Sequence, residues 1–188
     1  NLEPLDDYIK KAGFHLDAVA DYGNFMKYGG QTFGVPTDGN VHIQYTRKDL
    51  IDDPDNKKRF ADKFGTELKI PLTWEDTLRV QEFLMDPSKD LYGSGNLRNR
   101  ANGVTWWYMI FYSAGGFPFD DDMKPTLDTP AGQYAVDLYL QDKKVNHPEA
   151  ANWGTPQMIP HIAQGHVVSC QYWDGTCKTI ANPKQSKT

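Results

Sequence analysis

The chain has 188 residues, of which 39% are hydrophobic and 24% charged, and its formal net charge is −5. This composition excludes a disordered chain, and the acidic balance argues against a nucleic-acid-binding protein, which carries a basic face. No run of about 18 apolar residues occurs, so the sequence predicts no membrane span. The chain opens with Asn1-Leu2-Glu3-Pro4 instead of a signal peptide, so we expect a cytoplasmic protein or a sequence that starts after its signal.

The first fifty residues are expected to combine short helices with strands. Helices are predicted over residues 2–11 and 17–27, each ended by glycine. Strands are predicted over residues 31–36 and 41–45, because apolar and polar residues alternate in the second of them. The Asp-Gly pair within residues 37–40 predicts a turn between these strands.

Helices dominate the rest of the chain. Thr73 is expected to cap a helix that runs to about Met85, and Thr129 and Thr155, each followed by proline, repeat this start signal. The other predicted elements are a helix with Phe60 and Phe64 that stops at Gly65, a loop over residues 92–102, an aromatic helix over 105–114 and a buried strand over 167–170. Together these elements predict an α/β or α+β fold with few strands.

Candidate sites for chemistry are weakly signalled. Gly93-Ser94-Gly95-Asn96 lacks the ending of a phosphate loop, so a flexible loop is expected there. Asp120-Asp121-Asp122 lacks the spaced ligands of a calcium loop. His161 and His166 are five residues apart, not the four of a helical metal pair, so no metal site is expected. His42 is interpreted as a solvated strand histidine.

Two aromatic segments carry more information. Trp106-Trp107-Tyr108 and Tyr172-Trp173-Asp174 each place large rings beside polar groups. A sugar stacks its apolar C–H face on an aromatic ring while polar side chains bind its hydroxyls, which is the general pattern of a small-ligand cleft. Consecutive tryptophans on a helix point in different directions, so at least one of Trp106 and Trp107 is expected in the core.

Five segments in order over about 140 residues resemble the family 1 extracellular solute-binding proteins of bacterial ABC importers. These segments are Gly34-Val35-Pro36, Tyr45-Thr46-Arg47-Lys48-Asp49-Leu50, Pro71-Leu72-Thr73-Trp74-Glu75-Asp76, Ser113-Ala114-Gly115-Gly116 and Ile162-Ala163-Gln164-Gly165. The last segment departs from the family pattern, which usually has phenylalanine where Ile162 stands.

The resemblance implies a fold similar to maltose-binding protein, with two α/β lobes and the ligand between them. The chain then corresponds to a type II periplasmic-binding-protein-like lobe, mostly helical with a small mixed sheet. Residues 1–30 are expected to end the first lobe, 31–175 to form the second lobe with a hinge strand at 31–36, and 176–188 to lead to the returning hinge. By this comparison the chain is expected to be a fragment that lacks most of the first lobe.

The resemblance also implies the function and the ligand contacts. We expect a substrate-binding component, periplasmic or extracellular, that delivers a sugar, oligosaccharide or polyol to a membrane permease, with no cofactor, metal or catalytic residue. The implied ligand-binding residues are Thr37, Asp38, Gly39, Asn40, Arg98, Asn99, Trp106, Trp107, Trp173 and Asp174.

Two other functions remain open at this point, a carbohydrate-active enzyme that uses Asp38 and Asp174, and a sensor or adhesion module. The sequence does not name the sugar. It also leaves open whether Cys170 and Cys177 form a disulfide, which an oxidising compartment would allow.

Overall fold

A computed structural model describes residues 2–15, 26–36, 39–184 and 186–187 of the chain. The chain divides into two compact units, Asn1–Val41 and His42–Thr188. Most of the helix predicted over residues 17–27, and Thr37 and Asp38 of the predicted turn, lie outside the described residues. The predicted lobe boundaries at residues 30 and 175 stay a prediction.

The described residues of the first unit form one helix and one hairpin. Its described elements are α1 (Asp6–Ala12), β1 (Lys27–Tyr28) and β2 (Gln31–Thr32). Gly29 and Gly30 have φ values of 56° and 81°, as a tight two-residue hairpin turn requires. The Asp6 carboxylate accepts a hydrogen bond from Thr32 N (3.0 Å), and this bond lowers the pKa of Asp6. The strand predicted over residues 31–36 is shorter than expected, because β2 ends at Thr32.

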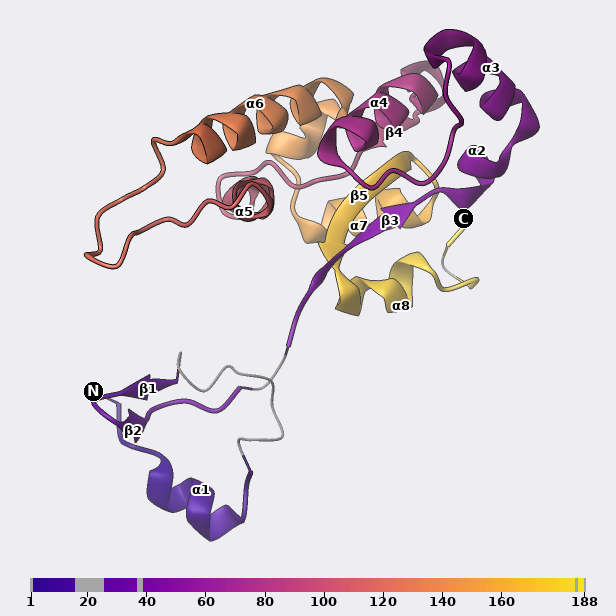
Figure 1. The fold of residues 1–188 in the computed structure, drawn as a ribbon. Helices are drawn as coiled ribbons and strands as arrows, with labels where there is room; N and C mark the ends of the chain where they lie inside the picture. The colour runs from indigo at the N-terminus through magenta and orange to yellow at the C-terminus, as the bar shows by residue number, and fades with distance from the viewer. Residues whose placement is uncertain (1, 16–25, 37–38, 185, 188) are drawn as a thin grey trace. The chain divides into compact units, whose positions relative to one another are not determined.

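The second unit surrounds a small mixed sheet (Figure 1). Its strands are β3 (His42–Thr46), β4 (Tyr92–Ser94) and β5 (Val167–Trp173), in the order β3-β5-β4. Strand β5 pairs antiparallel with β3 and parallel with β4. Its helices are α2 (Lys48–Asp52), α3 (Pro54–Phe64), α4 (Trp74–Leu84), α5 (Gly103–Ser113), α6 (Pro130–Val145), α7 (Thr155–Ala163) and α8 (Cys177–Ile180), with short 3-10 turns at Pro87–Lys89, Pro148–Ala151 and Asp174–Thr176.

Most predicted helix starts are confirmed by their caps. Thr73 Oγ1 accepts a hydrogen bond from Asp76 N (3.1 Å), and Thr129 Oγ1 accepts one from Gly132 N (3.3 Å). The prediction for Thr155 is wrong by one residue, because the N-cap of α7 is Gly154. The Gly154 N–H is satisfied by the Gln157 side chain (3.0 Å), so no threonine hydroxyl is needed there.

The loop predicted over residues 92–102 contains strand β4, and its glycines are packed instead of flexible. A Cβ added at Gly93 would lie 2.8 Å from Gln81 Cβ and 2.9 Å from Val145 Cβ. Gly93, Ser94, Gly95 and Asn96 are all buried. Glycine therefore lets β4 approach α4 and α6 closely. This close approach explains why a strand contains glycine, a residue that strands otherwise disfavour.

The core consists of three hydrophobic clusters, two of which include residues of β5, a strand that is buried at six of its seven residues. The first cluster joins β5 to α5, α7 and α8, and the second joins it to α2, α3 and α4. The third lies between α5 and α6, and Figure 1 shows α6 running beside α4. None of the described helices is long and apolar enough to cross a bilayer.

A buried polar network fixes the segment after β4. Asn96 Nδ2 donates to Asp142 Oδ1 (3.1 Å) and to Gln171 Oε1 (3.0 Å), while Asn96 Oδ1 accepts from Gln171 N (3.0 Å). Arg98 Nη1 donates to Asp142 Oδ2 (3.0 Å). Since buried polar groups need partners, this network holds the segment between β4 and α5 against α6 and β5.

Candidate functional site

One end of the sheet gathers a cluster that we call the aromatic end, formed by His42, Trp106, Met109 and Trp173. Strand pairing sets His42 opposite Trp173, and their rings meet edge to face at 4.7 Å. Trp106 lies beneath them with 1% of its surface exposed, and its ring is 5.4 Å from that of Trp173. Trp106 Nε1 donates to Gln171 O (2.9 Å), so this tryptophan is a buried support.

His42 is half-buried, which corrects its interpretation as a solvated histidine. Its Nδ1 lies 2.6 Å from Met109 Sδ, and its ring is 5.6 Å from that of Trp106. Burial lowers the pKa of His42, because the apolar surroundings disfavour the charged imidazole. The sequence pattern showed only strand alternation here and gave no sign of the two tryptophans packed against this ring.

Trp173 is partly exposed and its backbone is firmly held. Tyr45 Oη donates to Trp173 O (3.0 Å), and Thr176 Oγ1 donates to the same carbonyl (2.6 Å). Asp174, also partly exposed, begins the 3-10 turn that follows. Trp173 therefore offers a fixed aromatic surface with a carboxylate next to it in sequence, an arrangement suited to a ligand with both apolar and hydroxyl faces.

Arg98 and Asn99 are committed to contacts within the protein. The Arg98 side chain is 9% exposed; its Nη1 also donates to Tyr139 O (2.8 Å), and its guanidinium lies 3.9 Å over the Tyr139 ring. Asn99 Nδ2 donates to Trp153 O (2.6 Å), and Asn99 Oδ1 accepts from Asn102 N (2.9 Å). These two residues shape the loop that places α5, and through α5 the ring of Trp106.

Of the other predicted contact residues, Trp107 packs away from the aromatic end, against α5. Trp107 is half-buried and stacks on Phe111 (4.7 Å, 17°), and its Nε1 finds no hydrogen-bond partner among the described residues. Gly39 and Asn40 are exposed and belong to the first unit. Thr37 and Asp38 lie outside the described residues.

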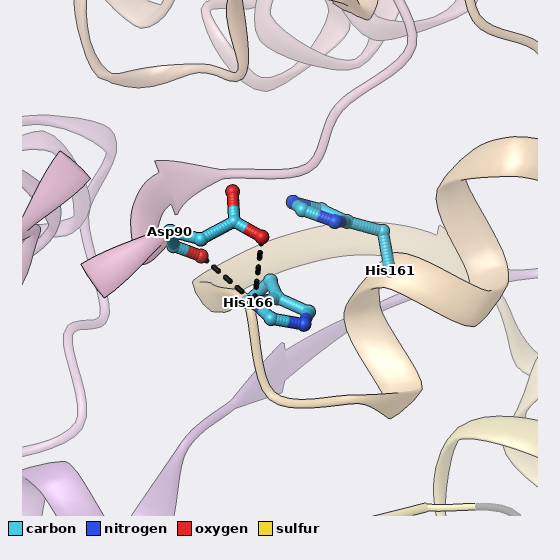
Figure 2. Close-up of side chains that lie close together, drawn as sticks. All are labelled: Asp90, His161 and His166. Carbon is cyan, nitrogen blue, oxygen red and sulfur yellow. Dashed lines mark hydrogen bonds and ion pairs between the residues drawn. The ribbon is translucent and has the colours of Figure 1, made fainter. Parts of the chain in front are cut away.

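The opposite end of the sheet brings together Asp90, His161 and His166 (Figure 2). We call this cluster the histidine end. The rings of His161 and His166 stack at 4.8 Å, although their spacing of five gave no reason to expect contact. The available signal was Gly165, which has a φ of 87° and turns the chain back after α7.

Both cysteines are free thiols in this structure. Cys170 lies in β5 and is fully buried, whereas Cys177 at the start of α8 is exposed. Burial raises the pKa of the Cys170 thiol, since the thiolate loses its hydration there. The sequence left open whether Cys170 and Cys177 form a disulfide. In this structure they do not: one thiol is buried and inert, and the other is accessible.

Solved structures share this fold. An ABC transporter solute-binding protein from Agrobacterium radiobacter in complex with ribitol has a TM-score of 0.77 at 23% identity, over 99% of this chain and 45% of that chain. A solute-binding protein from Thermotoga lettingae with bound α-D-tagatose has a TM-score of 0.76 at 23% identity, over 100% of this chain and 47% of that chain. The predicted type II binding-protein-like lobe with a small mixed sheet is confirmed.

Sequence comparisons point to the same kind of protein as the solved structures. A probable amino-acid ABC transporter periplasmic-binding protein from Sinorhizobium fredii is 25% identical over 188 residues, which is 97% of this chain and 38% of that protein. The chain thus spans less than half the length of the relatives described here. Residues 2–181 match the model of the bacterial extracellular solute-binding proteins, and the chain belongs to that family.

Proposed function

We propose that the protein is the substrate-binding component of a bacterial ABC importer, works on the periplasmic or extracellular side of the membrane, and captures a sugar, oligosaccharide or polyol for a permease. Family membership over residues 2–181 supports the transport role. The ribitol and tagatose found in two proteins of the same fold support the ligand class.

The observation that carries this proposal is the partly exposed ring of Trp173 above the buried ring of Trp106. An aromatic face held in one orientation binds the C–H side of a sugar or polyol with little loss of side-chain entropy. The Asp174 carboxylate accepts hydrogen bonds from hydroxyl groups. We therefore assign Trp173 and Asp174 as the leading ligand contacts of this chain.

Arg98 helps to distinguish a polyol from an amino acid, the ligand class in the name of the Sinorhizobium fredii relative. An α-carboxylate is usually bound by a guanidinium or by several N–H donors. Arg98 is the one arginine among the contacts predicted from the sequence, and its guanidinium already bonds to Asp142 and packs on Tyr139. The predicted contact residues therefore suit an uncharged, hydroxylated ligand better than an amino acid.

The proposed mechanism is closure of two lobes around the ligand. Residues 31–175, which overlap the unit His42–Thr188, supply the second lobe in this proposal. A ligand that touches both lobes stabilises the closed form, because only that form makes all the contacts. Binding then requires no bond to be made or broken, so we propose that the protein is not an enzyme, and that this chain alone binds sugar weakly or not at all.

A thermal-shift screen of the intact protein against polyols, sugars and amino acids tests this proposal. A ligand at 100 times its dissociation constant stabilises the folded state by about 2.7 kcal/mol. We expect a polyol or sugar to shift the melting temperature, with Trp173→Ala abolishing the shift, Trp173→Phe keeping most of it and Trp74→Phe serving as the control. A shift with amino acids only would overturn the assigned ligand class.

The non-enzymatic role is tested on the same hit. Incubation with the intact protein, followed by mass spectrometry, should return the ligand unchanged. Release of a cleaved sugar that disappears in Asp174→Asn would instead establish a hydrolase. Micromolar sugar binding by the 188-residue chain would contradict the need for a second lobe.

A further inference from the structure

The histidine end lies where β4 and β5 begin. Asp90 stands two residues before β4, His161 is in the last turn of α7, and His166 directly precedes β5. One ligand atom from each of these three side chains lies within 4.8 Å of the others. Figure 2 shows the His161 ring reaching from α7 toward the Asp90 carboxylate, with His166 beside it.

The backbone brings these side chains together through two tight turns. Helix α7 ends at Ala163, and Gly165 with φ 87° reverses the chain so that His166 N donates to His161 O (3.2 Å). Asp90 has a φ of 55° and ends the 3-10 turn Pro87–Lys89 in the left-handed conformation, with its N–H donating to Pro87 O (3.1 Å). Aspartate adopts this conformation more readily than most residues, and the turn sets the direction of its side chain.

Two of the three groups already stand at the spacing of metal ligands. His166 Nδ1 is 3.1 Å from Asp90 Oδ2 and 2.9 Å from Asp90 O. Two ligand atoms bound at 2.0–2.1 Å to a tetrahedral zinc ion are roughly 3.3 Å apart. A metal ion could therefore replace the proton that His166 Nδ1 donates to Asp90 with little movement of either side chain.

His161 supplies a nitrogen that has nothing to bind. Its Nε2 is buried and finds no hydrogen-bond partner among the described residues, although such atoms are usually satisfied by protein, water or an ion. The rings of His147 and Trp153, at 5.0 and 5.2 Å, pack against the His161 ring. These rings enclose the His161 imidazole and leave Nε2 as a nitrogen available to a metal ion.

We propose that Asp90, His161 and His166 bind one divalent transition-metal ion, such as zinc, with water in the fourth position. Two imidazoles and one carboxylate suit zinc, nickel or copper, whereas calcium and magnesium prefer oxygen ligands alone. On binding, the His166 ring keeps one proton, which moves from Nδ1 to Nε2 so that Nδ1 is free for the metal ion. The site is independent of the proposed transport function, because β5 separates it from Trp173 by roughly 20 Å.

Isothermal titration of the tag-free, EDTA-treated 188-residue chain with zinc, and separately with magnesium, tests the proposal. We expect one zinc ion per chain, no magnesium binding, and a folded-to-unfolded ratio about 100-fold higher at zinc 100 times its dissociation constant. His161→Gln, His166→Gln and Asp90→Asn should each weaken zinc binding by at least about 100-fold, since even outer contacts of metal sites contribute 10- to 100-fold.

Two controls address adventitious binding. His15→Gln removes an exposed imidazole, and Cys177→Ser removes the exposed thiol; both should leave zinc affinity unchanged. Circular dichroism in EDTA checks that each variant folds, and Asp90→Asn keeps the test valid if a histidine variant does not, because Asp90 is exposed. No zinc binding, or binding that survives all three cluster variants or vanishes in Cys177→Ser, overturns the proposal.

Discussion

The two ends of β5 are built in different ways. At the aromatic end, strand register sets His42 opposite Trp173, and the adjacent polar and aromatic residues are visible in the sequence. At the histidine end, a single turn at Gly165 stacks two histidines whose spacing conceals their contact. Trp173 and Asp174 could therefore be proposed as ligand contacts from the sequence, whereas the contact between His161 and His166 could not, because it depends on one backbone turn.

The largest expected effect is on the network that supports the aromatic end. Asp142→Ala leaves the Arg98 guanidinium buried without its carboxylate and removes an acceptor from Asn96. Loss of one partner of a buried ion pair costs about 3–5 kcal/mol. Urea unfolding should show this loss, while Asp137→Ala, at an exposed position on the same helix, should change stability by less than about 0.5 kcal/mol.

If the two ends are independent, the Asp142→Ala variant that remains folded in the absence of urea keeps its zinc affinity. A variant that loses zinc binding without losing secondary structure would show that the polar network couples the two ends.

The next largest effect is expected in β4, which leads from one end toward the other. Gly93→Ala forces a Cβ within 3 Å of Gln81 and Val145, and overpacking of this kind costs about 1–3 kcal/mol. Gly175→Ala is the matched control, since a Cβ there meets nothing within 4 Å. Equal melting temperatures for the two variants would contradict the close packing of β4.

Gly165→Ala should affect the histidine end and leave the aromatic end unchanged. The φ of 87° at this position is unfavourable for alanine by about 1–2 kcal/mol. A chain that relaxes this strain displaces His166 from His161. The free energy of zinc binding should therefore fall by more than the free energy of unfolding. The environment of Trp173, followed by tryptophan fluorescence, should stay unchanged; a shift in that signal would show that the turn also positions the aromatic end.

The smallest effect concerns the pH response of the aromatic end. Burial holds the pKa of His42 below its usual 6.5, so the unfolded chain binds this proton more readily than the folded chain. The His42 contribution to stability is therefore complete above about pH 6.5 and is lost as the pH falls through the folded pKa. An NMR titration of the His42 ring gives that pKa, and His42→Gln should flatten stability across this range. A pKa above 6.5 would contradict the burial of the ring.

The sequence predicted the elements whose signals are local. Thr73 and Thr129 cap their helices as expected, and Gly65 ends α3 with a φ of 68°. The Val-rich segment that starts at residue 167 is a buried strand. These features depend on residues within one or two helical turns of each other, which is the range over which sequence patterns carry information.

Features that depend on distant partners were not predicted. Strand β4 consists of Tyr92, Gly93 and Ser94, and only the surfaces of α4 and α6 make glycine favourable there. The ion pair between Arg98 and Asp142 joins residues that are 44 positions apart. Nothing near Arg98 in the chain indicates that partner, and the role of Arg98 at a ligand stays a prediction.

The two cysteines have a practical consequence. Cys170 is buried and holds its proton tightly, whereas Cys177 is exposed one residue after Thr176, whose hydroxyl bonds to the Trp173 carbonyl. A thiol-reactive fluorophore should therefore attach at a single natural position beside the proposed ligand surface. The chain already contains the attachment point for an optical sensor, in which arrival of a solute at Trp173 changes the emission of a dye without any mutation.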